Sequence, residues 1–123
     1  MGYDQWIQLE IYREGFDAET LLIALSLAFP RFTTRLSEDN DSGSLIDSDE
    51  GEKIIFTCNG RHLYDKGGLL FEEFSAQEIS KEIGCTIEIY YEGEEKLDAE
   101  QLKFVNGQKV EHKILDWVDV KDS

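Results

Sequence analysis

The sequence predicts an α+β domain built on an antiparallel sheet, and three observations lead to this class. Apolar and polar residues alternate in several segments, which is the period of a half-buried strand. Two other segments have apolar residues at helical spacing and capping residues at their ends. Asn106-Gly107 separates two strand-like segments near the C-terminus, and this dipeptide is a strong signal for a type I′ hairpin turn.

The N-terminal part of the chain predicts one strand and one helix. Residues 6–12 alternate, with Ile7, Leu9 and Ile11 on one side and Gln8 and Glu10 on the other. Asp17 is a favourable N-cap, and Phe16 and Leu21 have the spacing of a hydrophobic staple. The apolar face of this helix comprises Leu21, Leu22, Leu25, Ala28 and Phe29, and the helix ends before Pro30. Ile23 and Leu27 widen that face, so we expect the helix to be well buried against the sheet.

The middle of the chain predicts two strands separated by a long loop. Phe32, Thr34 and Leu36 alternate in a way that suggests the second strand. The acidic stretch from 37 to 52, which is also rich in Ser and Gly, predicts a long mobile loop. Residues 53–58 predict the third strand.

The C-terminal half predicts a short helix and a meander. Ser75 and Glu78 form a capping box, and Gly84 closes the helix that follows, with Ile79 and Ile83 on its apolar face. Strands are predicted at 86–92, 102–105 and 109–115. In order, the elements form βαβ, βαβ and a hairpin, which resembles the ferredoxin-like (split βαβ) arrangement with two helices on one face and an additional C-terminal β-hairpin. That fold hosts many unrelated functions, so no activity follows from it.

One stretch, 59–74, leaves two topologies open. Asn59-Gly60 is a turn signal, and it would return the chain into an extra strand at 61–64. Without that strand, the loop at 38–52 and the loop at 92–100 lie at opposite ends of the sheet. With it, both loops lie at one end and form a single acidic surface.

Length and composition predict one domain, residues 1–123, in the cytoplasm. The chain has 123 residues, enough to bury a core without disulfides or metals. Nothing at its N-terminus resembles a signal peptide, and no apolar run reaches the roughly 18 residues of a membrane-spanning helix. We expect Cys58 and Cys85 to be reduced and buried.

The charge is the most informative property of the sequence. The net charge is −15, which disfavours nucleic acids and anionic membranes as direct partners. The acid is concentrated in residues 38–52, in residues 92–100 and in the tail from 116, where Asp122 and Lys121 also lie. We predict partner-binding roles for Glu38, Asp39, Asp41, Asp47, Asp49, Glu50, Glu52, Glu92, Glu94, Glu95, Asp98, Glu100, Asp116 and Asp119.

No catalytic or metal motif is complete, so we expect neither an enzyme nor a cofactor. His62 and His112 are outside any recognisable catalytic motif, and the phosphate-binding and nucleophile motifs are absent from the sequence. Cys58 and His62 lack two further nearby ligands for zinc. Asp39, Asp41, Asp47 and Glu50 match positions 1, 3, 9 and 12 of a calcium loop, but Ser44 occupies the glycine position and Gly43 offers no side-chain ligand.

Two function classes remain. The first is an acidic inhibitor whose carboxylates occupy the basic nucleic-acid-binding surface of a partner, such as a nuclease or defence effector, by nucleic-acid mimicry. Anti-defence and nuclease-immunity proteins use this strategy, and the likeness here is in size and charge. The alternative is an interaction or regulatory module that binds through an aromatic sheet face and is acidic only for solubility. Its anchors would be Trp6, Tyr12, Tyr90 and Trp117.

Overall fold

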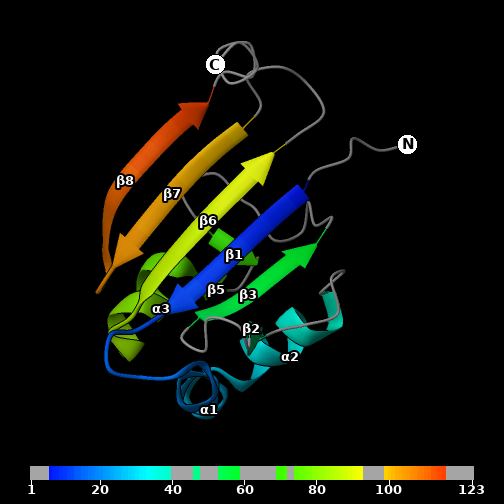
Figure 1. Ribbon diagram of the computed structural model, residues 1–123, viewed down its shortest axis with the longest axis vertical. Coiled ribbons are helices and arrows are strands. Elements are labelled where there is room, and N and C mark those ends of the chain that lie inside the picture. Colours follow the sequence, from blue (N-terminus) through cyan, green and yellow to red (C-terminus); the bar gives the residue numbers. More distant parts are fainter. Residues whose placement is uncertain are drawn as a thin grey trace.

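The computed structural model describes residues 6–39, 46–47, 53–58, 69–71, 74–92 and 99–115. These residues form an α+β fold in which helices cover one face of an antiparallel sheet (Figure 1). The predicted α+β class with an antiparallel sheet is therefore confirmed. The described residues contain three helices, whereas the sequence predicts two.

The main sheet has the strand order β2-β3-β1-β6-β7-β8, and every neighbouring pair is antiparallel. Its members are β1 (Trp6–Tyr12), β2 (Ile46–Asp47), β3 (Lys53–Cys58), β6 (Thr86–Glu92), β7 (Ala99–Val105) and β8 (Gln108–Leu115). Five of these strands are long, and β2 contributes only two residues. The segments predicted for β1, β3 and β6 agree with the structure, and β7 and β8 extend slightly beyond their predicted bounds.

Alternation gives the sheet two chemically different faces. On β1, Ile7, Leu9 and Ile11 are at most 1% exposed, whereas Gln8 and Glu10 are only partly buried. The inward residues of the other strands join the same core: Ile54, Phe56, Ile87, Ile89, Leu102 and Phe104. The helices pack onto this side, because their buried residues belong to the same cluster. The opposite side, which we call the open face, carries mainly polar residues.

Helix α1 (Ala18–Ala28) begins as the sequence predicts. The Asp17 carboxylate accepts a hydrogen bond from the Thr20 amide at 2.7 Å, and this bond lowers the pKa of Asp17. Leu21 and Leu25 are fully buried. The wider apolar face is wrong, because Ile23 is 57% exposed and Leu27 is 80% exposed. These two side chains are four residues apart and point away from the core, so they do not help to bury the helix.

Residues 30–39 form a helix, α2 (Pro30–Asp39), where the sequence predicts a strand and the start of a loop. Phe32 and Leu36 are both fully buried, and their spacing of four residues places them on one helical face. Thr34, which lies between them, is exposed. Pro30 ends the first helix as predicted, but it also starts the second, since proline is well tolerated at the first helical position.

Helix α3 (Ala76–Ile83) has the predicted Ser75 N-cap and glycine terminus, while the return bond of a capping box, from the Ser75 amide to the Glu78 side chain, is absent from these described residues. The Glu78 amide donates to the Ser75 hydroxyl at 3.5 Å, and Gly84 has φ of 74°. The helix packs on β6, β7 and β8. A small second sheet, β4 (Leu69–Phe71) paired with β5 (Phe74–Ser75), precedes it and was not predicted. The possible strand at 61–64 lies outside the described residues.

The β7–β8 hairpin has the predicted turn. Asn106 and Gly107 both have positive φ, 50° and 89°, as a type I′ turn requires. The turn is fixed to α3, because the Gly107 amide donates to the Ser80 hydroxyl at 2.9 Å and Gln77 donates to the Gly107 carbonyl at 2.9 Å. These bonds connect the hairpin to the helical layer.

Candidate functional site

The open face is a polar surface shared by five strands. Its members are Gln8, Glu10 and Tyr12 on β1, Lys53, Ile55 and Thr57 on β3, Glu88 and Tyr90 on β6, Gln101 and Lys103 on β7, and Glu111 and Lys113 on β8. Three of these twelve residues are acidic and three are basic, so this set carries no net charge. A surface that imitates nucleic acid needs a dense negative potential, and this face by itself does not provide it.

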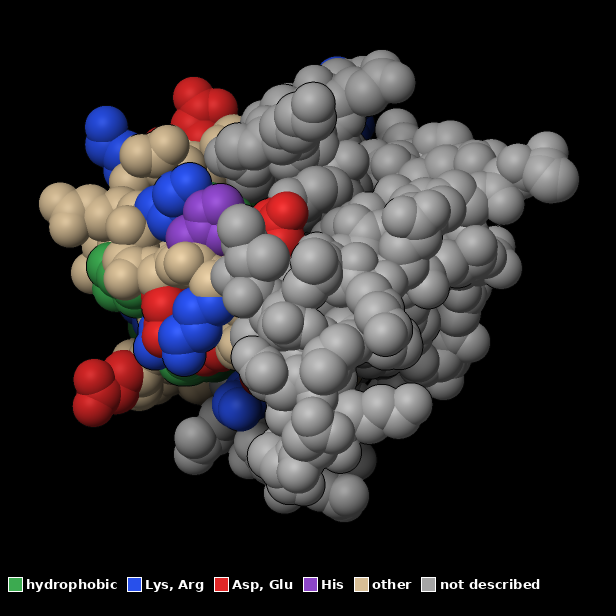
Figure 2. Space-filling model, turned by 90° about the horizontal axis from the view of Figure 1, so that it is seen from above, with side chains coloured by type: hydrophobic (Ala, Val, Ile, Leu, Met, Phe, Trp, Pro, Cys, Tyr) green, Lys and Arg blue, Asp and Glu red, His purple; other side chains and the backbone are tan. Residues whose placement is uncertain are grey.

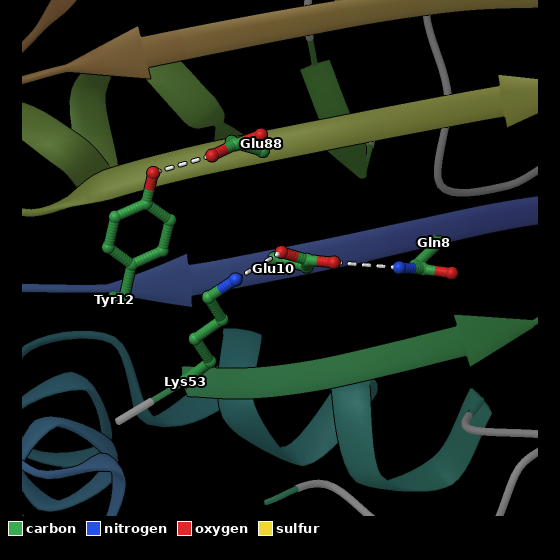
Figure 3. A network of polar contacts seen from close by, with 5 residues as sticks. All are labelled: Gln8, Glu10, Tyr12, Lys53 and Glu88. Carbon is green, nitrogen blue, oxygen red and sulfur yellow. Dashed lines mark hydrogen bonds and ion pairs between the residues drawn. The ribbon is translucent and has the colours of Figure 1, made fainter. Parts of the chain in front are cut away.

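A network of hydrogen bonds and an ion pair crosses three neighbouring strands of this face, β3, β1 and β6 (Figure 3). The Tyr12 hydroxyl donates to Glu88 Oε2 at 2.5 Å, which joins β1 to β6. Lys53 Nζ lies 3.3 Å from Glu10 Oε1, which joins β3 to β1, and Gln8 Nε2 donates to Glu10 Oε2 at 2.8 Å. Each carboxylate is thereby held in place by a neighbour on the same face.

Glu10 and Glu88 are directly opposite each other on β1 and β6. Two like charges in this arrangement destabilise a pair of strands. Lys53 offsets the charge of Glu10, while Glu88 receives a hydrogen bond from a neutral phenol. The centre of the open face therefore combines two carboxylates with one cationic partner in the network.

A hollow of about 320 Å³ lies beside this carboxylate pair. Its walls are formed by Gln8, Glu10, Glu88, Ile89, Tyr90 and Gln101, from β1, β6 and β7. Carboxylate and amide oxygens in these walls can accept hydrogen bonds, and the Tyr90 ring adds an aromatic surface. The hollow is suited to a small cationic group with several N–H donors.

Tyr12 is the titratable group that this environment perturbs most clearly. Burial, followed by the hydrogen bond to Glu88 and the negative charges of Glu88 and Glu10, raises the pKa of Tyr12 from 10.0 to about 12. All of these influences favour the neutral phenol. Tyr12 therefore remains a hydrogen-bond donor to Glu88 throughout the physiological pH range.

The structure places five of the predicted acidic residues by their backbone. Glu38 and Asp39 end α2, Asp47 lies in β2, Glu92 ends β6, and Glu100 lies in β7. The other predicted binding residues lie outside the described residues: Asp41, Asp49, Glu50, Glu52, Glu94, Glu95, Asp98, Asp116 and Asp119.

The strand directions give the sheet two ends, which we name the Tyr12 end and the Trp6 end. Asp47 and Lys53, which flank residues 48–52, are paired at the Tyr12 end. Glu92 and Ala99, which flank residues 93–98, are paired at the Trp6 end, and Leu115 pairs with Ala99 there. The chain thus enters the second acidic loop and the acidic tail from one end of the sheet, and it enters the β2–β3 connection from the other.

The described residues carry nearly half of the acidic side chains but only about a third of the net negative charge. They contain 13 Asp and Glu and 8 Lys and Arg, whereas the rest of the chain contains 14 acidic and 4 basic residues. Basic and acidic side chains are interspersed on the described part of the surface that Figure 2 shows. About two thirds of the net negative charge therefore belongs to the remaining residues, in the segments that join the described elements and at the two ends of the chain.

Two predictions about individual residues have clear outcomes. Cys85 is a buried free thiol, as expected, and burial raises its pKa to about 12 despite the opposing charge of Arg13. His112 lies on the terminal strand β8, where its Nε2 is 3.2 Å from Glu100 Oε1. Glu100, a predicted binding residue, thus has a partner within the sheet. Cys58 lies in β3, and His62 lies outside the described residues.

The aromatic anchors of the alternative hypothesis are only partly placed. Tyr12 and Tyr90 lie on the open face, and Trp6 begins β1, while Trp117 lies outside the described residues. Their surroundings on the open face are polar and charged instead of apolar. Aromatic contacts there would act together with charged neighbours.

Within the described residues, no group of three or more His, Cys, Asp or Glu side chains is arranged to hold a metal ion. None of the helices found in those same residues has both the length and the apolar character needed to cross a membrane. Comparisons of the chain with protein-family models, with curated proteins and with solved structures found no match.

The sequence did not reveal the hollow or the opposed carboxylates. Alternation indicates that Gln8, Glu10 and Glu88 face away from the core, but it does not show which strands are neighbours. The signal available in the sequence is the pair of strands 6–12 and 86–92, each with an outward glutamate near its centre. Their register decides whether these glutamates meet.

Proposed function

We propose that this chain is a non-catalytic acidic inhibitor that occupies the basic nucleic-acid-binding surface of a partner protein. The observation that carries the proposal is the uneven distribution of charge: the described residues hold 13 acidic and 8 basic side chains, whereas the remaining residues, in the connecting segments and at the chain ends, hold 14 acidic and 4 basic side chains. Carboxylates concentrated in this way attract a basic groove and speed association with it. A nuclease or a nucleic-acid-binding defence effector has such a groove.

The placement of the acidic segments refines the proposal. The loop at 93–98 and the tail from 116 both leave the Trp6 end of the sheet, so their acidic residues are available to one basic site. Residues 48–52 leave the Tyr12 end, which is about 20 Å away for strands of this length. We propose that the Trp6 end makes the principal contact and that the Tyr12 end extends it when the groove is long enough.

The proposal includes the fold type and the compartment. A ferredoxin-like frame with an added β7–β8 hairpin is supported by the order β2-β3-β1-β6, in which β3 lies between β2 and β1, and β1 lies between β3 and β6. A cytoplasmic location agrees with the buried free thiol of Cys85 and with partners that handle nucleic acids.

The test is a capture experiment with two matched variants. The chain is immobilised and exposed to a nuclease-treated host lysate at about 50 mM and about 200 mM salt, and bound proteins are competed with duplex DNA and with RNA. One variant neutralises four residues of the two segments that leave the Trp6 end: Glu94→Gln, Glu95→Gln, Asp98→Asn and Asp116→Asn. The other neutralises Asp47 and three residues of the segment that leaves the Tyr12 end: Asp47→Asn, Asp49→Asn, Glu50→Gln and Glu52→Gln.

We expect a basic nucleic-acid-binding protein that is released by competing nucleic acid and by the higher salt. The Trp6-end variant should bind this protein at least about tenfold more weakly, and the Tyr12-end variant should lose less. Inhibition of the captured protein's activity on nucleic acid completes the test. Capture that neither variant nor nucleic acid reduces would overturn the proposal.

A further inference from the structure

We infer that the hollow on the open face accepts an arginine side chain of the basic partner. The inference rests on the proposed function, because it assigns part of that partner's chemistry to a defined place on this chain. The hollow has a volume of about 320 Å³ and is lined by Gln8, Glu10, Glu88, Ile89, Tyr90 and Gln101. This volume is at the lower limit of small-molecule sites and suits one side chain.

The carboxylates beside the hollow need another cation. Glu10 and Glu88 are directly opposed across β1 and β6, which destabilises the sheet at that point. Both oxygens of Glu10 accept hydrogen bonds, and one of the donors is Lys53. In the described part of the chain, the Tyr12 hydroxyl is the polar partner of Glu88, and no ion pair joins Glu88 to Lys103 on the neighbouring strand. A cation in the hollow would offset this charge.

The other walls favour a guanidinium group over a metal ion or an ammonium group. Two carboxylates and two amide oxygens are fewer than the roughly six to eight oxygen ligands that calcium takes, and within the described residues no group of three or more His, Cys, Asp or Glu side chains is arranged to hold a metal ion. The side-chain oxygens of Gln8 and Gln101 supply further acceptors from β1 and β7. A guanidinium group has five N–H donors in a plane and stacks on aromatic rings, so it can contact Glu88, the amides and Tyr90 together. A lysine ammonium group lacks that planar geometry.

The test uses the whole chain and an arginine analogue, so it does not need the partner. Labelled protein is titrated with N-acetyl-arginine methylamide and, separately, with the corresponding lysine analogue at the same ionic strength. Chemical shifts of the Gln8 and Gln101 side-chain amides are followed by NMR. The test variant is Glu88→Gln, and the matched control is Glu111→Gln, which removes the same charge from the same face two strands away, where Glu111 pairs with Lys113 at 3.1 Å.

We expect saturable shifts with the arginine analogue, weaker binding of the lysine analogue and about fivefold weaker arginine binding in Glu88→Gln, with Glu111→Gln unchanged. Gln101→Leu provides a second test of the hollow if Glu88→Gln disturbs the fold. Absence of saturable shifts, equal binding of the two analogues, or an equal effect of Glu88→Gln and Glu111→Gln would overturn the inference. A negative titration would overturn the arginine site but not the proposed function, which the capture experiment tests. A failed capture would overturn the proposed function but would not change the result of the titration.

Discussion

The two faces of the central sheet have opposite chemistry although the same strands form them. The inward face is apolar and buried, as Leu9 and Ile11 on β1 illustrate, each at most 1% exposed. The open face carries Glu10 and Tyr12, the alternate residues of that strand. Because successive side chains point to opposite sides, one strand can contribute to the core and to a binding surface without a compromise between them.

The comparison shows which interactions set the register and which depend on it. The inward residues are strongly constrained, since a slip by one position would expose every apolar side chain. The register that they impose also places Glu10 directly opposite Glu88, an arrangement that is unfavourable for the sheet. The core thus fixes two opposed carboxylates on the open face, beside the hollow for which we propose an arginine ligand.

The largest difference in stability between variants of the two faces is expected from substitutions at two adjacent residues on β3. Phe56 is 1% exposed in the core, whereas Ile55 is partly exposed on the open face. We expect Phe56→Ala to lower the free energy of unfolding by about 3–5 kcal/mol through lost burial and a cavity. Ile55→Thr, which keeps the β-branched shape, should lower it by less than about 1 kcal/mol.

Urea denaturation of the two variants measures both quantities. The assay also needs two-state transitions with unchanged m-values, so that the midpoints can be compared. Similar losses for Phe56→Ala and Ile55→Thr would contradict the division of the sheet into a buried and an open face.

Much of this architecture could be predicted from the sequence because one face of the sheet is solvated. Alternation in 6–12 and 86–92 identified both strands with their bounds, and Asp17, Ser75 and Gly84 marked helix ends through local chemistry. The exception is Phe32 to Leu36. Residues at positions 32, 34 and 36 fit a period of two, but the apolar pair 32 and 36 equally fits one helical face, and a single turn of pattern does not distinguish them.

The parts that could not be predicted depend on contacts between distant segments. β2 and β4–β5 are only two or three residues long and exist through pairing, so they leave almost no periodic signal. Ile23 and Leu27 have helical spacing, yet no apolar surface of the frame covers them enough to bury them. The hollow requires β6 to lie between β1 and β7, and strand order is a property of the whole fold.

The β7–β8 turn packs against α3 on the inward side of the sheet. A substitution in this turn is expected to lower the stability by less than Phe56→Ala does. Gly107 has φ of +89°, and a Cβ there would lie 2.7 Å from Lys81 Cβ on α3. Gly15 has a similar φ of +87° with nothing within 4 Å of a Cβ. We expect Gly107→Ala to cost about 1–3 kcal/mol of unfolding free energy and Gly15→Ala to cost less, since only the first adds a clash to backbone strain. Thermal and urea denaturation measure the unfolding free energy that each variant loses. Equal losses would show that α3 can shift to accommodate the added Cβ without a loss of stability.

The smallest expected effect is the contribution of Tyr12, on the open face, to the pH dependence of stability. Its folded-state pKa of about 12 is above the ordinary value of 10.0, so the fold favours the protonated phenol. The stability that this group contributes is fully present below pH 10 and is lost as pH rises through about 12. Ultraviolet titration of the five tyrosines should show a late component that Tyr12→Phe removes.

Glu88→Gln tests the cause of that shift. Burial is its largest cause, so the variant should lower the pKa of Tyr12 only part of the way toward 10.0, while Glu111→Gln should leave it unchanged. A late component that survives Tyr12→Phe would assign the shift to another tyrosine. A full return to 10.0 in Glu88→Gln would instead show that the carboxylate controls Tyr12 and that the open face is more solvated than its packing indicates. The hollow next to Glu88 would then hold a cation less tightly, because solvent would already screen the charge that the cation is expected to offset.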